Sequence, residues 1–413
     1  MLSKIHKDKV TNVIEYILAI ILVYCNGSWL MFEAKSPLQL LLIVTVLVYL
    51  MIRKSWYQEL QFPNIWVLLL AVFPFLSLIT NIHRDINLFS VIYVSASYIL
   101  LACFNNKTFV SILNRYAHFI YVLMLISIPI GIITLVDYSV LSVFPVSIND
   151  LFGSSNTNGY YNLILYTDRV VNDLRTQSIF WEPGAWAFNE VFAFYWFIFI
   201  KQDYKKLPYL LLSLLLTLST TGLFLGILLL FAAFIKIPVK EIRRKIIYLA
   251  AGSAILLISG SVYISTTTDI NIAELFYEQV VEKFTSDSKS DSFEQRVETT
   301  KQAYEIAVEN PFFGIGKTTD ETQLFITSGL AEIVYQLGFL YLGLYLVLFR
   351  VLFSKLGWII SCLFIGIMIN GEAYSFYILS SLIVIYGAKN FINVNPFHKK
   401  FAGHPENQLA TIK

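Results

Sequence analysis

Long apolar stretches follow one another along most of the chain, separated by short polar segments. A helix needs roughly 17 to 25 predominantly apolar residues to cross the hydrocarbon core of a bilayer. On this criterion the pattern predicts about twelve membrane-spanning helices. They are expected near residues 12–32, 37–52, 64–82, 87–104, 117–136, 183–200, 207–219, 221–235, 246–265, 329–349, 356–370 and 374–392.

Two stretches, 137–182 and 266–328, are too long and too polar to fit this alternation, and we expect both to be large loops. In the second loop, the apolar spacing at 272–284 and 293–308 is typical of helices lying on the membrane surface. The Ser- and Asp-rich run Thr285–Ser292 between them is turn-forming. No internal repeat is visible, so the prediction is one all-α polytopic integral membrane domain over residues 1–413.

Composition supports a membrane protein and excludes a soluble globular one, because 57% of the residues are hydrophobic and only 14% are charged. The net charge of +2 gives no indication of a nucleic-acid partner. The three cysteines lack the paired spacing of a metal site or a disulfide framework. We therefore expect no metal ion and no cofactor.

Basic residues predict how the chain lies in the membrane, since Lys and Arg in short loops mark the cytoplasmic side. If twelve helices span and the N-terminus is inside, most of the 30 basic residues fall on the cytoplasmic side. Both long loops then lie on the outer face. The prediction is a multi-pass protein of the cytoplasmic membrane, with both termini in the cytoplasm and an active site outside.

Each long loop carries an arginine ahead of an apolar helix: Arg175 in R-T-Q-S-I-F-W-E-P-G, and Arg296 before N-P-F-F-G-I-G at 310–316. A guanidinium group is always charged and binds phosphate oxygens through a planar fork of donors. Two such groups could together bind phosphate groups of a substrate. Arg169, Lys301 and Lys317 in the same loops are further candidates for substrate binding. His83 and Arg84, in a short outer loop, are candidates to orient substrate, although a histidine in a loop is more often simply solvated.

A carboxylate beside such a phosphate-binding group is a candidate general base, and Glu182 is the carboxylate nearest in sequence to Arg175. Alternatively, Glu182 pairs with an arginine or caps the helix that starts at Pro183. The adjacent Trp181 offers a face on which a sugar ring can stack, or belongs to an interfacial aromatic belt.

Carboxylates inside predicted spans are a second source of candidates, because a charge there is costly and marks a cavity or a paired site. Glu332 is the stronger candidate and Glu190 the weaker one. Glu15 and Glu372 lie nearer the ends of spans, where water could solvate them. Gly314 and Gly316 are expected to permit a tight backbone turn, either in a substrate-binding loop or in a simple loop-to-helix junction.

The string from Ser292 to Gly316 resembles the signature loop of bacterial O-antigen polymerases and O-antigen ligases. F-W-E-P-G-A-W-A at 180–187, L-S-T-T-G-L at 218–223 and Gly338-x-x-Tyr341 resemble further motifs of that superfamily in the same order, so the likeness covers about residues 170 to 345. It implies a GT-C-like, metal-independent membrane glycosyltransferase that acts on oligosaccharides linked to undecaprenyl diphosphate. Arg175 and Arg296 would be its essential arginines.

One departure separates the two activities within this resemblance. The ligases carry a His-[Asn/Ser/Gln] pair where this chain has Thr327 and Ser328, with nine residues between Ser328 and Gly338. The missing histidine favours a polymerase, which transfers the growing O-antigen or capsule glycan to the non-reducing end of a new lipid-linked unit. A chain-length regulator would be its protein partner.

Three alternatives remain open: an O-antigen ligase that acts on lipid A-core, a lipid-linked oligosaccharide flippase or other transporter, and a non-catalytic partner in polysaccharide export. Transporters of this size usually show repeat symmetry and bind near mid-membrane, whereas here the arginines lie in outer loops. A non-catalytic partner predicts that Arg175 and Arg296 can be lost without consequence.

Overall fold

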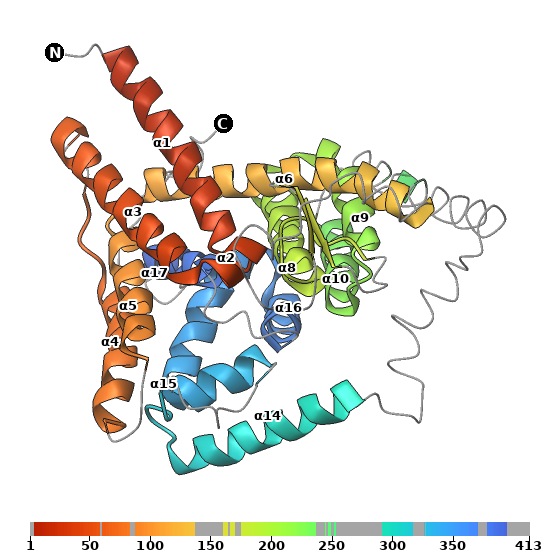
Figure 1. The fold of residues 1–413 in the computed structure, drawn as a ribbon. Coiled ribbons are helices and arrows are strands. Elements are labelled where there is room, and N and C mark those ends of the chain that lie inside the picture. Colours follow the sequence, from red (N-terminus) through yellow and green to blue (C-terminus); the bar gives the residue numbers. More distant parts are fainter. Residues whose placement is uncertain are drawn as a thin grey trace.

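The computed structural model describes residues 4–57, 60–82, 87–136, 160–163, 166–169, 175–236, 291–316, 328–370 and 378–394, with residues 244, 247, 248, 252 and 326. Nearly all of its elements are helices (Figure 1). In chain order they are α1 (Lys4–Tyr24), α2 (Trp29–Glu33), α3 (Lys35–Tyr57), α4 (Ile65–Thr80), α5 (Leu88–Ala102), α6 (Asn106–Val136), β1 (Tyr160–Leu163), β2 (Tyr166–Arg169), α8 (Pro183–Tyr195), η2 (Trp196–Lys201), η3 (Tyr204–Lys206), α9 (Leu207–Leu216), α10 (Thr220–Lys236), α14 (Asp291–Glu309), α15 (Gly329–Leu352), η5 (Phe353–Leu356), α16 (Trp358–Asn370) and α17 (Ile378–Val394).

The predicted apolar stretches become helices wherever the structure describes them, except that most of 246–265 lies outside the described residues. Within the part of the chain that the structure describes, three helices are long and apolar enough to cross a membrane by length and composition: Lys35–Tyr57, Asn106–Ile133 and Gly329–Leu356. Five shorter apolar helices accompany them. The chain is thus a helical membrane protein, while the number of spans stays a prediction.

Side-chain caps define several helix starts. Asn64 Oδ1 accepts a hydrogen bond from Val67 N (3.1 Å) at the start of α4, and Asn87 Oδ1 accepts one from Ser90 N (3.0 Å) at α5. Such caps satisfy N–H groups that a helix leaves unpaired at its first turn. Ser28 caps α2 in the same way, so the predicted span 12–32 is divided between α1 and α2.

Two other expectations need correction. α6 begins at Asn106 rather than near 117, because its first turns mix polar and apolar residues and so escape a search for apolar runs. The first long loop also contains an antiparallel hairpin, β1 with β2, so the fold is not purely α. Aromatic and β-branched residues favour strands, and this segment of Tyr, Leu and Thr has that composition.

α14 confirms the helix predicted over 293–308. It is the cyan helix at the lower edge of Figure 1 and packs against α15. The helix predicted over 272–284 lies outside the described residues, as does most of the turn-forming run 285–292.

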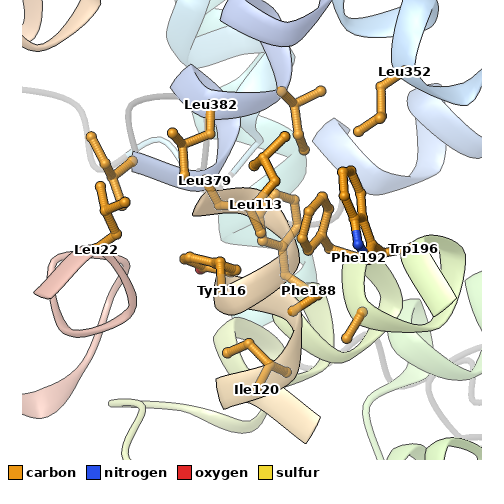
Figure 2. Packing of buried hydrophobic residues seen from close by; sticks show 14 of the residues in the cluster. Leu22, Leu113, Tyr116, Ile120, Phe188, Phe192, Trp196, Leu352, Leu379 and Leu382 are labelled. Carbon is orange, nitrogen blue, oxygen red and sulfur yellow. The ribbon is translucent and has the colours of Figure 1, made fainter. Parts of the chain in front are cut away.

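The core lies where α1, α6, α8 and α17 meet (Figure 2). Its aromatic rings interlock, as in the edge-to-face contact of Tyr116 with Phe192 at 5.7 Å between centroids. A buried polar node runs through this core: Asn26 Nδ2 donates to Asn189 Oδ1 (2.8 Å), which also accepts from the Tyr116 hydroxyl, and Asn26 Oδ1 accepts from Leu379 N (2.9 Å). The node fixes how four helices meet.

Candidate active site

Six of the predicted site residues lie in two places. Arg175, Trp181 and Glu182 lie in an irregular segment, with a turn at Ser178 and Ile179, that leads into α8. Gly314, Gly316 and Glu332 lie where the loop after α14 meets α15. His83, Arg84 and Lys317 lie outside the described residues, and Arg169 is described only as the last residue of β2.

The segment 175–182 is anchored by its backbone on two sides. Thr176 N donates to Leu216 O (3.0 Å) at the end of α9. On the other side, the segment pairs with the chain between α1 and α2, where Trp29 N donates to Ile179 O (3.0 Å) and Trp181 N to Gly27 O (3.2 Å). The backbone next to Arg175 is therefore held in place by the hydrogen bond of Thr176 to α9.

Glu182 occupies the N-cap position of α8, with extended backbone angles. Its side chain makes no capping hydrogen bond, so the capping alternative for this carboxylate is wrong. It remains half-buried. An anionic group at this position is favoured by the partial positive charge of a helix N-terminus.

The S-T-T-G turn packs beside this segment. Ser219 caps α10, since its Oγ accepts a hydrogen bond from Gly222 N (3.3 Å). Leu218 before it has φ of 47°, and Ser178 in the anchored segment has φ of 54°. Left-handed backbone is unusual for non-glycine residues and costs of order 1–3 kcal/mol, a cost found most often at functional sites.

The second place is a break inside α15. Gly338 has φ of 81° and ψ of 173°, so the helix predicted over 329–349 is not continuous. A break leaves carbonyls before it and an N–H group after it without their intrahelical partners. The loop 311–316 supplies those partners through three hydrogen bonds: Ile315 N to Tyr335 O (2.8 Å), Gly316 N to Gln336 O (3.0 Å) and Phe339 N to Pro311 O (2.8 Å). We call residues 310–316 and 335–339 together the joint.

The expected tight turn in N-P-F-F-G-I-G is confirmed, because Gly314 and Gly316 have φ of 61° and 78°. Gly314 lies against the backbone of residues 335–337 across the joint. These glycines therefore serve first to join the loop to the broken helix.

Glu332 lies in the first turn of α15, nearly two turns before the break at Gly338. Gln336 Nε2 donates to Glu332 Oε1 (3.3 Å). At the start of the same helix, Ser328 Oγ accepts from Ala331 N (3.3 Å) and donates to Asn370 Oδ1 (2.6 Å) at the end of α16. Residue 328 is therefore a helix cap bound to a neighbouring helix.

α14 packs one face against α15. Ala303 and Ala307 are fully buried in the cluster that contains Ala331 and Tyr335 of α15. Position 296 lies on the same face of α14, two turns before Ala303. Its side chain is outside the described part of the structure, so the pairing of the two arginines stays a prediction.

Lys301 lies on a different side of α14 from Ala303 and Ala307. It is exposed, and its Nζ lies 3.9 Å from Glu305 Oε1 one turn later. Nearby, burial raises the pKa of Tyr304, which keeps its hydroxyl neutral.

Two hollows adjoin these places. A small apolar hollow lies between α8, α10 and α16; it is lined by Gly184, Ala187, Phe188, Thr221, Gly222, Leu225 and Met368. A small cavity adjoins the joint; it is lined by Pro74, Ser77, Ser90, Val91, Val94, Gly316, Gln336 and Leu337. α16 contributes Met368 to the hollow and binds Ser328 through Asn370.

Some polar residues near these places escaped the sequence analysis. Ser77 and Asn81, at the end of α4, hydrogen-bond the joint. The sequence feature that could have identified them is their position as polar residues at the end of an apolar helix. Burying such residues is costly unless they have hydrogen-bond partners. Glu190, in contrast, was noted as a weak candidate: it is fully buried and accepts a hydrogen bond from Ser213 of α9.

A helical membrane protein is the class that these observations define. Residues 207–337 match a family model described as O-antigen ligase. The match supports assignment of the chain to the superfamily of O-antigen polymerases and ligases, membrane enzymes that act like glycosyltransferases. Neither the curated proteins nor the solved structures compared with the chain gave a match.

The matched segment runs from the start of α9 to Leu337, the residue before the break in α15. It therefore includes Arg296, Gly314, Gly316 and Glu332. Arg175 and its anchored segment precede it, so they rest on the sequence resemblance and on the contacts described above.

Proposed function

We propose that the protein is a polysaccharide repeat-unit polymerase. It transfers a growing glycan from undecaprenyl diphosphate to the non-reducing end of another lipid-linked repeat unit, in O-antigen or capsule synthesis. The reaction takes place on the outer face of the bacterial cytoplasmic membrane, with both termini in the cytoplasm. A chain-length regulator is the protein partner we expect.

In this proposal the bond between the sugar C1 and the diphosphate oxygen breaks as a bond from C1 to the acceptor hydroxyl oxygen forms. Undecaprenyl diphosphate leaves with the electron pair, and a carboxylate takes the hydroxyl proton. Arg175 and Arg296 bind the diphosphate, since guanidinium groups form strong bonds to phosphate oxygens. Preorganised donors of this kind contribute about 3–4 kcal/mol each to transition-state stabilisation.

Glu332 is the general base that we favour. Its carboxylate is half-buried and bound by Gln336 beside the joint, so its position is set by neighbouring structure. Glu182 is the alternative, because it lies in the same segment as Arg175 and its side chain does not cap α8. Trp181, Arg169, Lys301, Lys317, His83 and Arg84 are proposed to contact the sugar or phosphate groups.

The observation that favours a polymerase over a ligase is the residue at position 327. Ser328 fits the second position of the ligase pair, where its hydroxyl caps α15 and binds Asn370. The preceding residue is Thr327 rather than histidine. A ligase mechanism that needs that histidine has no equivalent group at these positions.

The test replaces Arg175 and Arg296 separately by alanine in the native host, with Lys54→Ala as a control for losing an exposed basic residue near a helix end. A C-terminal fluorescent fusion reports the amount of inserted protein. Surface polysaccharide is then extracted and separated on a gel. We expect both arginine variants to lose long chains and keep a single repeat, while Lys54→Ala keeps the full ladder.

Other outcomes assign other functions. Loss of every repeat from the surface, single repeats included, indicates a ligase or a flippase. An unchanged ladder removes the arginines from the mechanism and leaves a non-catalytic partner. Glu332→Gln and Glu182→Gln in the same assay decide the base, because only the residue that takes the proton should abolish chain growth when its carboxylate becomes an amide.

A further inference from the structure

The end of α4 contacts both sides of the joint. Ser77 Oγ donates to Gln336 O (2.9 Å), which belongs to the broken helix α15. Asn81 Nδ2 donates to Gly314 O (3.0 Å), which belongs to the loop. Both side chains are almost fully buried, with exposed fractions of 1% and 4%.

Ser77 and Asn81 are one helical turn apart, so their side chains lie on one face of α4. They are also bound to each other, because Asn81 Nδ2 and Asn81 N both donate to Ser77 O (2.9 and 3.2 Å). The distance between the two donors is therefore fixed by α4. Two donors at fixed spacing set the register of the loop 310–316 against the broken helix.

A small cavity beside the joint is bordered by Ser77, Gly316 and Gln336, so Ser77 approaches the joint at a place where a void interrupts the packing. Buried carbonyl groups need hydrogen-bond partners, and a carbonyl oxygen has two lone pairs to satisfy. Gln336 O already accepts from Gly316 N, and Ser77 supplies its second partner from another helix.

Gln336 connects this arrangement to the proposed chemistry. Ser77 holds its backbone carbonyl, and its side-chain Nε2 donates to Glu332 Oε1. A shift of the backbone at Gln336 would therefore move the Glu332 carboxylate. Misplacing a reacting group by about 1 Å lowers turnover by as much as roughly 100-fold.

We infer that Ser77 and Asn81 are positioning residues, which set the register of the joint and thereby the position of the Glu332 carboxylate. The catalytic part of this inference rests on the proposed polymerase function. The register itself does not, and it can be measured separately.

The variants are Ser77→Ala and Asn81→Ala, with Ser77→Thr as the conservative change. Ser95→Ala is the matched control, because Ser95 of α5 is also a buried serine whose Oγ donates to a backbone carbonyl, Ala71 O at 2.7 Å, but away from the joint. Purified full-length protein is assayed with lipid-linked repeat units. Amide hydrogen exchange is followed in peptides that cover 310–316 and 335–340.

We expect Ser77→Ala and Asn81→Ala to lower kcat by roughly 10- to 100-fold with little change in KM. Ser77→Thr restores kcat and Ser95→Ala retains it. In both alanine variants, the amides of Ile315, Gly316 and Phe339 should exchange faster, whereas Ser95→Ala leaves their rates unchanged. Unchanged exchange in the alanine variants overturns the inference about register, whatever the enzyme does.

The two proposals fail in different ways. If exchange rises as expected but wild-type protein does not extend lipid-linked units, the register stands and the polymerase function fails. If wild-type protein polymerises and Ser77→Ala loses no more kcat than Ser95→Ala, the positioning role is overturned and the function stands.

Discussion

Gly314 and Gly338 pack against each other's segments so closely that neither has room for a side chain. A Cβ atom on Gly338 would lie 2.5 Å from the carbonyl carbon of Phe312, and one on Gly314 would lie 2.6 Å from Leu337 N. These neighbours are backbone atoms, which cannot move aside as a flexible side chain can.

Gly338→Ala and Gly314→Ala should therefore be severely destabilising. The backbone angles alone cost about 1–3 kcal/mol for a residue with a side chain, and the clash adds to that cost. Gly343→Ala is the control, since Gly343 lies in the same helix with nothing within 4 Å of its Cβ position. Size-exclusion profiles of fluorescent fusions after heating should show early loss of the first two proteins only, and a Gly338→Ala protein as stable as Gly343→Ala would contradict the described joint.

Ser328→Ala should lower the free energy of unfolding by about 1 kcal/mol, the usual cost of losing a helix N-cap. It also removes the hydrogen bond to Asn370 that joins α15 to α16. Ser361→Ala is the comparison, because the Ser361 hydroxyl bonds only to Trp358 O within α16. Equal thermal stability of the two variants would show that the cap contributes nothing.

Glu15 and Arg115 form an ion pair at the crossing of α1 and α6, with 2.8 Å between Glu15 Oε2 and Arg115 Nε. Tyr49 and Ser111 also donate to the carboxylate. Removing one partner of a buried pair costs about 3–5 kcal/mol, so Glu15→Ala should be strongly destabilising. In a double-mutant cycle, Arg115→Ala should add much less in the Glu15→Ala background than alone, and simple additivity would rule out the pair.

Glu190→Gln should leave chain growth and stability intact or improve stability. A glutamine can still accept the hydrogen bond from Ser213, and it removes the cost of a buried charge. Ser213→Ala should instead lower stability by about 1–3 kcal/mol, because the buried acceptor loses its partner. Loss of the polysaccharide ladder in Glu190→Gln, at normal protein level, would make Glu190 a member of the active site.

Helix positions could be predicted because a helix that crosses a membrane needs a long run of apolar residues, which is visible in the sequence. The starts of α4, α8 and α15 agree with the sequence to within a residue of 64, 183 and 329. The start of α6 could not be predicted in this way, since Asn106–Tyr116 is helical without being continuously apolar. Gly314 and Gly316 were predicted to turn, and they do.

The features that the sequence did not predict depend on contacts between residues far apart in the chain. The break at Gly338 depends on a loop that lies more than twenty residues earlier in the chain, and nothing in the sequence 329–349 alone requires it. Glu15, expected to be solvated near a span end, is 7% exposed because residues of α3 and α6 enclose it. Ser77 and Asn81 gain their role only through partners more than 230 positions away.

The three hydrogen bonds between the loop and α15 join backbone groups on both sides. They therefore depend on the backbone conformation of the joint and not on the polar groups of its side chains. Phe312, 60% exposed at the edge of the joint, contributes none of the three hydrogen bonds that close it. Its side chain can therefore change while the architecture persists. Substitutions at position 312 should thus leave the three backbone hydrogen bonds of the joint in place.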